Sequence, residues 1–256
     1  MWTATPFCEV NMNISISVSS TAKENGRKAA ERIALLINAA IAKKGYARIV
    51  LSTGASQFEM FDHLVKLDVD WSKVEMFHLD EYVALPETHI ASFRKYLKER
   101  FVNVVHPKAA HFVNGEGDVR ANIAQLTKEL RSDEIDVGVI GIGENGHIAF
   151  NDPPADFDAT EAYRVVNLDH KCRMQQVGEG WFATEDDVPK QAISMLPKQI
   201  MACRAIVSVV PHKVKAKAVY DTITQKVNNM VPATLLKTHP QWYLFIDDDA
   251  ASMLMG

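Results

Sequence analysis

Residues 136–154 read DVGVIGIGENGHIAFNDPP, an apolar run that passes directly into a glycine-rich turn. An apolar run without alternation is typical of a strand in a parallel sheet that is covered on both faces. A second stretch, VEMFHLDEY at 74–82, has the same form, because its apolar run ends in Asp80 and Glu81. Ligands of α/β proteins bind at the carboxyl ends of the parallel strands. The two stretches therefore predict an α/β fold with a site where both strands end.

Further apolar runs alternate along the chain with segments of helical periodicity. Strands are expected at 14–18, 47–51, 74–79, 136–140, 205–211 and 242–246. Helices are expected over 21–44 and around the apolar residues of 58–65, 93–101, 119–130 and 214–223. This alternation predicts one doubly wound, mostly parallel sheet, Rossmann-like, with helices on both faces. We also expect a disordered leader at 1–13, a single domain over 14–256, and a long functional loop or lid at 153–190.

The bulk properties exclude several classes of partner. A net charge of -4 provides no basic field that would hold a nucleic acid. No apolar run approaches the roughly 18 residues that a membrane span requires. The three cysteines, odd in number and far apart, fit a reducing compartment better than a disulfide framework. We therefore expect a cytoplasmic protein that acts on a small molecule.

A first candidate site follows the strand at 47–51. Ser52, Thr53, Gly54, Ala55 and Ser56 lie between this strand and a helix. Backbone N–H groups and hydroxyls at such a position converge on an anion. The alternative is an ordinary turn in which a serine or threonine caps the helix. Because the loop lacks the Gly-Lys-Ser/Thr of a nucleoside triphosphate loop, it favours a monophosphate over ATP.

The glycine-rich turn formally matches a dinucleotide fingerprint through Gly141, Gly143 and Gly146. That fingerprint should open a helix, whereas prolines at 153–154 soon interrupt any helix here. We therefore expect no nicotinamide cofactor. The glycines instead let the backbone pass close to a ligand while they present His147.

Titratable side chains surround both strand ends. His147 has Glu144 and Asp152 nearby in sequence, and a carboxylate partner can orient a histidine for acid–base work. Asp80 and Glu81 form a candidate general-base site. The alternatives are a structural histidine and a solvated strand end. Because the histidines show no metal-binding spacing, neither a metal nor another cofactor is expected.

Several motifs resemble those of one family, the glucosamine-6-phosphate deaminases (isomerases), within the group that includes the 6-phosphogluconolactonases. The similar segments are STGAS at 52–56, FHLDEYVALP at 77–86, GIGENGHIAFNDP at 141–153, VPKQAI at 188–193 and a lysine-bearing helix start at 211–219. The resemblance extends from about residue 14 to residue 250. The IAFN after His147 favours the deaminase branch over the lactonases.

The resemblance implies that the chain converts glucosamine 6-phosphate and water to fructose 6-phosphate and ammonia, as a hydrolase of amino-sugar metabolism in N-acetylglucosamine catabolism. It implies that His147 opens the ring, that Asp80 moves a proton between C2 and C1, and that Asp152 orients the histidine. The phosphate would be held by the loop at 52–56 and by two cations, and a homo-oligomer is expected. The implied substrate-binding residues beyond this loop are Glu81, Gly143, Gly146, Arg173 and Lys215.

The chain departs from the family pattern beside the histidine. Asn145 stands where the family has an aspartate, and Asp152 stands where it has a glutamate. Asparagine can donate and accept hydrogen bonds, but it carries no charge. One hypothesis is that Glu144 supplies the missing carboxylate, for the same reaction or for a related hexosamine 6-phosphate. The alternatives are a lactone hydrolase, in which His147 activates water, and a catalytically weakened regulatory protein that binds sugar phosphates.

Overall fold

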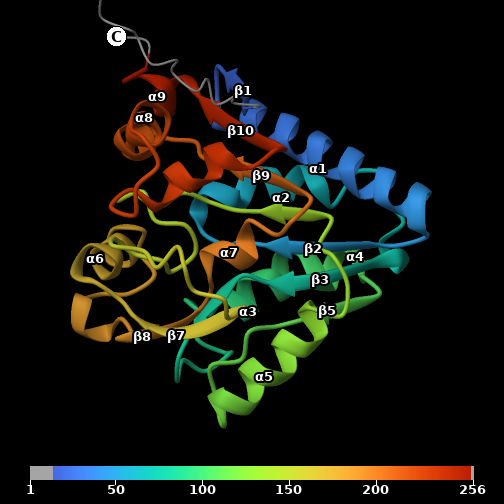
Figure 1. Cartoon of the computed structure of the whole chain (residues 1–256), viewed down its shortest axis with the longest axis horizontal. Coiled ribbons are helices and arrows are strands. Elements are labelled where there is room, and N and C mark those ends of the chain that lie inside the picture. The colour runs from blue at the N-terminus through green and yellow to red at the C-terminus, as the bar shows by residue number, and fades with distance from the viewer. Residues whose placement is uncertain (1–13, 255–256) are drawn as a thin grey trace, which may run out of the picture.

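The computed structural model describes residues 14–254, and its centre is a seven-stranded sheet in which all neighbouring strands are parallel (Figure 1). The order across the sheet is β1-β10-β9-β6-β2-β3-β5. In chain order the strands are β1 (Ile14–Ser19), β2 (Ala47–Leu51), β3 (Val74–His78), β5 (Ala109–His111), β6 (Val137–Val139), β9 (Ala205–Val209) and β10 (Trp242–Asp247). The predicted parallel sheet is confirmed, and only the short β5 was absent from the prediction.

Helices cover both faces of this sheet, which confirms the doubly wound arrangement. They are α1 (Ala22–Lys44), α2 (Phe58–Leu64), α3 (Phe93–Leu97), α4 (Asn103–Val105), α5 (Val119–Leu130), α6 (His170–Gly178), α7 (Pro197–Ile200), α8 (Ala216–Thr224) and α9 (Asp248–Ala251). Ile49 of β2 packs in one buried cluster with α1 and α2. Its neighbour Val50 packs in the other cluster, with α5, α8 and α9. Successive strand residues thus face two cores, so the apolar runs show no alternation.

The longest helix, α1, follows its sequence signals closely. Thr21 caps it, because its hydroxyl oxygen accepts a hydrogen bond from the backbone N–H of Glu24 at 3.2 Å. The helix ends at Gly45, whose φ of 87° is the left-handed conformation that glycine adopts without steric cost. The predicted helix around 93–101 is less regular, since α3 passes through one wide turn into the short α4.

A second, antiparallel sheet was not predicted. It consists of β4 (Asp80–Tyr82), β8 (Gln191–Met195) and β7 (Tyr163–Asn167), in that order. The segment 153–190, expected to be a long loop, contains both β7 and α6 (Figure 1). The expectation of a long loop was therefore wrong. The two elements were missed because they are only five and nine residues long, and such short elements leave little periodicity in the sequence.

The chain passes from the central sheet into the small sheet at a single residue. β3 ends at His78 and β4 begins at Asp80, so only the buried Leu79 separates them. Leu79 keeps contact with both sheets, since its N–H donates to Leu51 and its carbonyl accepts from Met195. This crossing fixes the position of Asp80 at the junction of the two sheets.

The expected leader at 1–13 lies outside the described residues, and the single domain over 14–256 stays a prediction. Within residues 14–254, no helix combines the length and the apolar character that crossing a membrane demands.

Candidate active site

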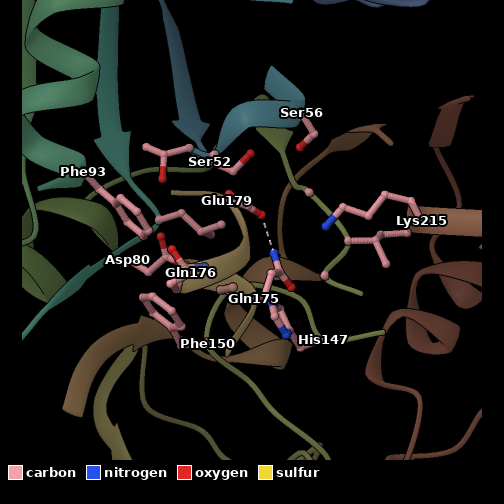
Figure 2. A pocket seen from close by; sticks show the side chains of 17 residues that line it. Ser52, Ser56, Asp80, Phe93, His147, Phe150, Gln175, Gln176, Glu179 and Lys215 are labelled. Atoms are coloured by element: carbon pink, nitrogen blue, oxygen red, sulfur yellow. Dashed lines mark hydrogen bonds between the residues drawn. The ribbon is translucent and has the colours of Figure 1, made fainter. Parts of the chain in front are cut away.

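Four segments that follow strands of the central sheet line one pocket (Figure 2). The loop at 52–56 follows β2, Asp80 follows β3, the turn at 141–147 follows β6, and Lys215 follows β9. Because β6, β2 and β3 are neighbours in the sheet, their carboxyl ends bring Asp80 and His147 to the same cavity.

The loop after β2 has the features of an anion cradle. Ser52, Thr53, Gly54 and Ser56 line the pocket, whereas Ala55 does not and instead begins the helical turn that leads to α2. The Ser52 hydroxyl is buried and has no hydrogen-bond partner among the described residues. Gly54 has a φ of 108°, which a residue with a side chain rarely adopts. A buried hydroxyl without a partner favours a ligand at this loop.

Asp80 is a buried carboxyl at the floor of the pocket. It is 6% exposed, and burial, followed by the neighbouring charge of Glu81, raises the pKa of Asp80 to about 8. A carboxyl group whose pKa lies near neutrality can both accept and release a proton during a reaction. This property suits it for moving a proton between two atoms of one substrate.

Glu81 does not line this pocket, contrary to its predicted role in substrate binding. Its carboxylate accepts hydrogen bonds from the Ser92 hydroxyl at 2.9 Å and from the backbone N–H groups of Phe93 and Arg94, at 3.2 and 2.8 Å. The Arg94 guanidinium lies 3.3 Å from the same carboxylate. Glu81 therefore anchors the start of α3, which in turn positions Phe93 in the pocket wall.

The glycine turn brings His147 into the pocket. The N–H of Gly143 donates to the carbonyl of His147 at 2.9 Å, and the N–H of Gly146 donates to the carbonyl of Gly143 at 3.0 Å. A Cβ atom at position 143 would lie 2.2 Å from Nε2 of His147, so the imidazole occupies that space. Gly146 has a φ of 83° and makes the turn without lining the pocket.

Asp152, and not Glu144, is the carboxylate beside the histidine. Nδ1 of His147 lies 3.2 Å from Oδ1 of Asp152. Burial acts to raise the pKa of Asp152, but hydrogen bonding and charge from His147 outweigh it, so this pKa lies below its usual value. Glu144 is exposed and does not line the pocket, so the place beside the histidine belongs to Asp152 and not to Glu144 in this structure.

Asn145 connects the histidine to that carboxylate. Its amide group donates to Oδ1 of Asp152 at 3.2 Å, and its side-chain oxygen accepts from the backbone N–H of His147 at 3.1 Å. Asn145 therefore fixes both partners, without a charge of its own. Orienting groups of this kind determine the direction in which an imidazole points.

Cys172 lies against this pair, although the sequence showed only scattered cysteines. Potential ligand atoms of His147, Asp152 and Cys172 all lie within 4.8 Å of one another. Burial, followed by the charge of Asp152, raises the pKa of the Cys172 thiol well above its ordinary value. The sulfur is therefore a neutral thiol that packs against the pair.

Lys215 and Arg173, the two predicted phosphate-binding cations, have different surroundings. Lys215 lines the pocket at 5% exposure, and burial lowers the pKa of its ammonium group. Within residues 14–254 it forms no ion pair. Arg173 does not line the pocket, because its guanidinium pairs with Glu185 at 2.6 Å. Of the two cations, only Lys215 faces the pocket.

Helix α6 supplies a part of the pocket that was not predicted from the sequence. Gln175, Gln176 and Glu179 line the pocket from this helix and its end. The available signal was Asp169, whose carboxylate caps the helix by accepting the N–H of Cys172 at 2.6 Å. Two aromatic side chains, Phe93 and Phe150, complete the wall and stack with a centroid separation of 5.8 Å.

Comparisons with known proteins show the family of this chain. The family model of glucosamine-6-phosphate isomerases/6-phosphogluconolactonase matches residues 20–244. A glucosamine-6-phosphate deaminase of Halothermothrix orenii is 36% identical over 241 residues, which cover 91% of this chain and 98% of the relative. A deaminase of Listeria monocytogenes is 36% identical over 205 residues, which cover 80% of this chain and 86% of the relative.

Solved structures show the same fold. A structure described as a monomeric glucosamine-6-phosphate deaminase superposes with a TM-score of 0.85 at 27% identity, covering 93% of this chain and 99% of the other. A putative 6-phosphogluconolactonase of Neisseria gonorrhoeae has a TM-score of 0.71 at 22% identity, covering 91% and 99%, and shares the fold. The resemblance inferred from the motifs is confirmed: the chain belongs to the family of glucosamine-6-phosphate isomerases and 6-phosphogluconolactonases.

Proposed function

We propose that the protein is an amino-sugar-phosphate deaminase, which converts glucosamine 6-phosphate, or a close hexosamine 6-phosphate, and water to the ketose 6-phosphate and ammonia. The observation that carries this proposal is the pocket that holds Asp80, His147, the loop at 52–56 and Lys215 together. Relatives of more than 30% identity are named glucosamine-6-phosphate deaminases, which supports this substrate class.

The side chains suit the proton transfers that this reaction needs. His147 donates a proton to the ring oxygen and takes one from the anomeric hydroxyl, so the ring opens to an aldehyde and the imidazole is charged again. Asp80 takes the C2 proton while His147 protonates the aldehyde oxygen, which gives an enolamine. Asp80 returns the proton to C1, which gives an iminium at C2. Water adds to this iminium, and a proton passes from the added water to the nitrogen. The C–N bond then breaks to leave ammonia and the ketone, and the remaining proton returns to His147. His147 and Asp80 thus each donate and accept a proton during the reaction, as in general acid–base catalysis.

A lactone hydrolase would need His147 to activate water but would have no use for a buried carboxyl at Asp80. Ammonia release from a panel of hexosamine 6-phosphates, without added metal or nucleotide, tests the proposal. We expect stoichiometric ammonia and ketose 6-phosphate from one of them. Faster opening of 6-phosphogluconolactone without any ammonia would support the hydrolase instead. Binding without turnover would support a regulatory protein.

Lys215→Ala should mainly raise KM, because the ammonium group holds the phosphate in both the ground state and the transition state. Hydrogen bonds to charged groups contribute about 1.5–3 kcal/mol, which corresponds to roughly 10- to 100-fold in KM. Steady-state kinetics of ammonia release measure the effect. Lys217→Ala, two residues later in α8, removes an exposed lysine that pairs with Asp221. It is the matched control and should leave KM near the native value.

Gly143→Ala should lower kcat by at least about tenfold, since misplacing a catalytic group by about 1 Å costs up to a hundredfold. The added methyl group displaces the imidazole of His147, because Nε2 of the ring lies 2.2 Å from the place that the methyl carbon would take. Gly178→Ala, at a glycine with open space around its Cβ, is the control. Equal activity of both variants would show that His147 tolerates displacement.

We also propose a cytoplasmic homo-oligomer that takes part in N-acetylglucosamine catabolism. The reducing compartment suggested by the scattered cysteines supports the location, and the names of the relatives support amino-sugar metabolism. One solved relative is described as monomeric, so the fold does not require an oligomer. The mass in solution, measured by light scattering, decides between the two states.

A further inference from the structure

The anion cradle faces a carboxylate, which a phosphate site would not be expected to contain. Glu179, at the end of α6, lines the pocket together with Ser52, Ser56 and Lys215, and the labelled side chains of Glu179 and Lys215 both point into it (Figure 2). Glu179 lies close enough to Lys215 for its charge to act on the pKa of that ammonium group. Lys215 is the only lysine or arginine that lines the pocket in the described part of the chain.

The carboxylate of Glu179 is held in place by its own segment. One oxygen accepts a hydrogen bond from the Gln175 amide at 2.7 Å, and the other accepts from the Trp181 indole N–H at 3.0 Å. Each carboxylate oxygen has a further lone pair that can accept another hydrogen bond. Glu179 is therefore a fixed acceptor at the pocket wall, and a fully ionised phosphate placed beside it would be repelled.

A phosphate ester with one remaining proton avoids this repulsion. Its P–O–H group donates to a carboxylate, and such charge-assisted hydrogen bonds are short and strong. On the basis of the proposed function, we propose that Glu179 accepts a hydrogen bond from a protonated phosphate oxygen, so that the pocket binds the monoanion of the sugar phosphate. Lys215 and the hydroxyls of the loop at 52–56 then hold the unprotonated oxygens.

This proposal predicts a pH dependence of binding. The second pKa of a phosphate ester is about 6, so each pH unit above that value removes about nine tenths of the monoanion and raises Kd about tenfold. The titratable groups whose pKa values feel the charge of Glu179 are Tyr82, Tyr96 and Lys215. Burial raises the pKa of both tyrosines, so they stay neutral over pH 6–8.

Glu179→Gln isolates the contribution of this carboxylate. The amide keeps the shape of the side chain but presents an N–H donor, which suits the dianion. The variant retains Lys215, Asp80 and His147. Any proton that these groups take up or release when ligand binds is therefore the same in both proteins and cancels in the comparison. Isothermal titration with a hexitol 6-phosphate, which has no amino group and cannot react, measures Kd at pH 6 and pH 8. Repeating it in buffers of different ionisation enthalpy gives the number of protons taken up.

We expect the ratio of Kd at pH 8 to Kd at pH 6 to be at least about tenfold larger for the native protein than for Glu179→Gln. We also expect the native protein to take up about one more proton per ligand at pH 8. Glu185→Gln removes a carboxylate that pairs with Arg173 of α6 outside the pocket, so it controls for a loosened helix and should keep the native ratio.

Equal proton uptake by the native protein and Glu179→Gln would overturn the proposal, and so would a lost pH dependence in Glu185→Gln. Equal affinity of the native protein for the unphosphorylated hexitol and for the hexitol 6-phosphate would also overturn the proposal. Glu179 would then accept a hydrogen bond from a carbon-bound hydroxyl and not from the phosphate. These measurements do not depend on turnover. If ammonia is released but the native protein takes up no extra proton, the deaminase proposal stands and the proposed role of Glu179 is wrong. If the extra proton is taken up but no hexosamine 6-phosphate releases ammonia, the role of Glu179 stands and the deaminase proposal is wrong.

Discussion

Asp80→Asn is expected to lower kcat for ammonia release by about a thousandfold or more, since general acid–base groups contribute up to roughly 10⁴-fold. The amide has the shape of the carboxyl but cannot take the C2 proton. The rise in Tm on adding a hexitol 6-phosphate should persist, because the loop at 52–56 and Lys215 are untouched. A variant that turns over at a near-native rate would remove Asp80 from its proposed role.

The same variant should change stability in a way that depends on pH. In the unfolded chain an aspartate titrates at about 3.9, whereas burial raises the pKa of Asp80 to about 8 in the folded protein. The folded state therefore binds a proton that the unfolded state has lost, so the native protein loses stability as pH rises between these values. The Tm of Asp80→Asn, relative to native, should increase from pH 4 to pH 9. In the native enzyme, kcat/KM should rise with pH up to about 8.

Asp152→Asn is the second change with a large expected effect, about 10²- to 10³-fold on kcat, because a carboxylate sets the tautomer and orientation of its imidazole. The amide can turn an N–H group toward Nδ1 of His147, from which the Asp152 oxygen lies 3.2 Å away. Steady-state kinetics and the pH profile of kcat measure the loss.

Glu144→Gln is the matched control for Asp152→Asn. It replaces an exposed carboxylate that is close to His147 in sequence but does not line the pocket. We expect less than about threefold loss, as for other exposed charges. A large loss in Glu144→Gln together with a small loss in Asp152→Asn would reverse the assignment of the orienting carboxylate.

The central sheet could be predicted because its strands are buried on both faces and therefore read as unbroken apolar runs. The site at its edge followed from the same pattern, since Asp80 and His147 each come after such a run. The small sheet could not be predicted, because β4 has only three residues and a single residue separates it from β3. The role of α6 was missed for a similar reason, and with it Glu179.

The errors among the predicted site residues have a common physical origin. Nearness in sequence does not fix the direction in which a side chain points. Neighbouring residues of a strand face opposite sides, so Asp80 lines the pocket while Glu81 anchors α3. Within the glycine turn, Glu144 is exposed although His147 is buried. Arg173 lies on the pocket-forming helix, yet its guanidinium pairs with Glu185.

The contact between residue 143 and the imidazole offers a way to sort relatives of this chain by sequence alone. Because the ring fills the volume that any Cβ atom at this position would take, only glycine is compatible with the histidine in its present place. A homologue that carries alanine, serine or a larger residue there must have moved its histidine or given up this chemistry. The residue type at position 143 thus distinguishes homologues that retain the acid–base pair from homologues whose pocket has another function.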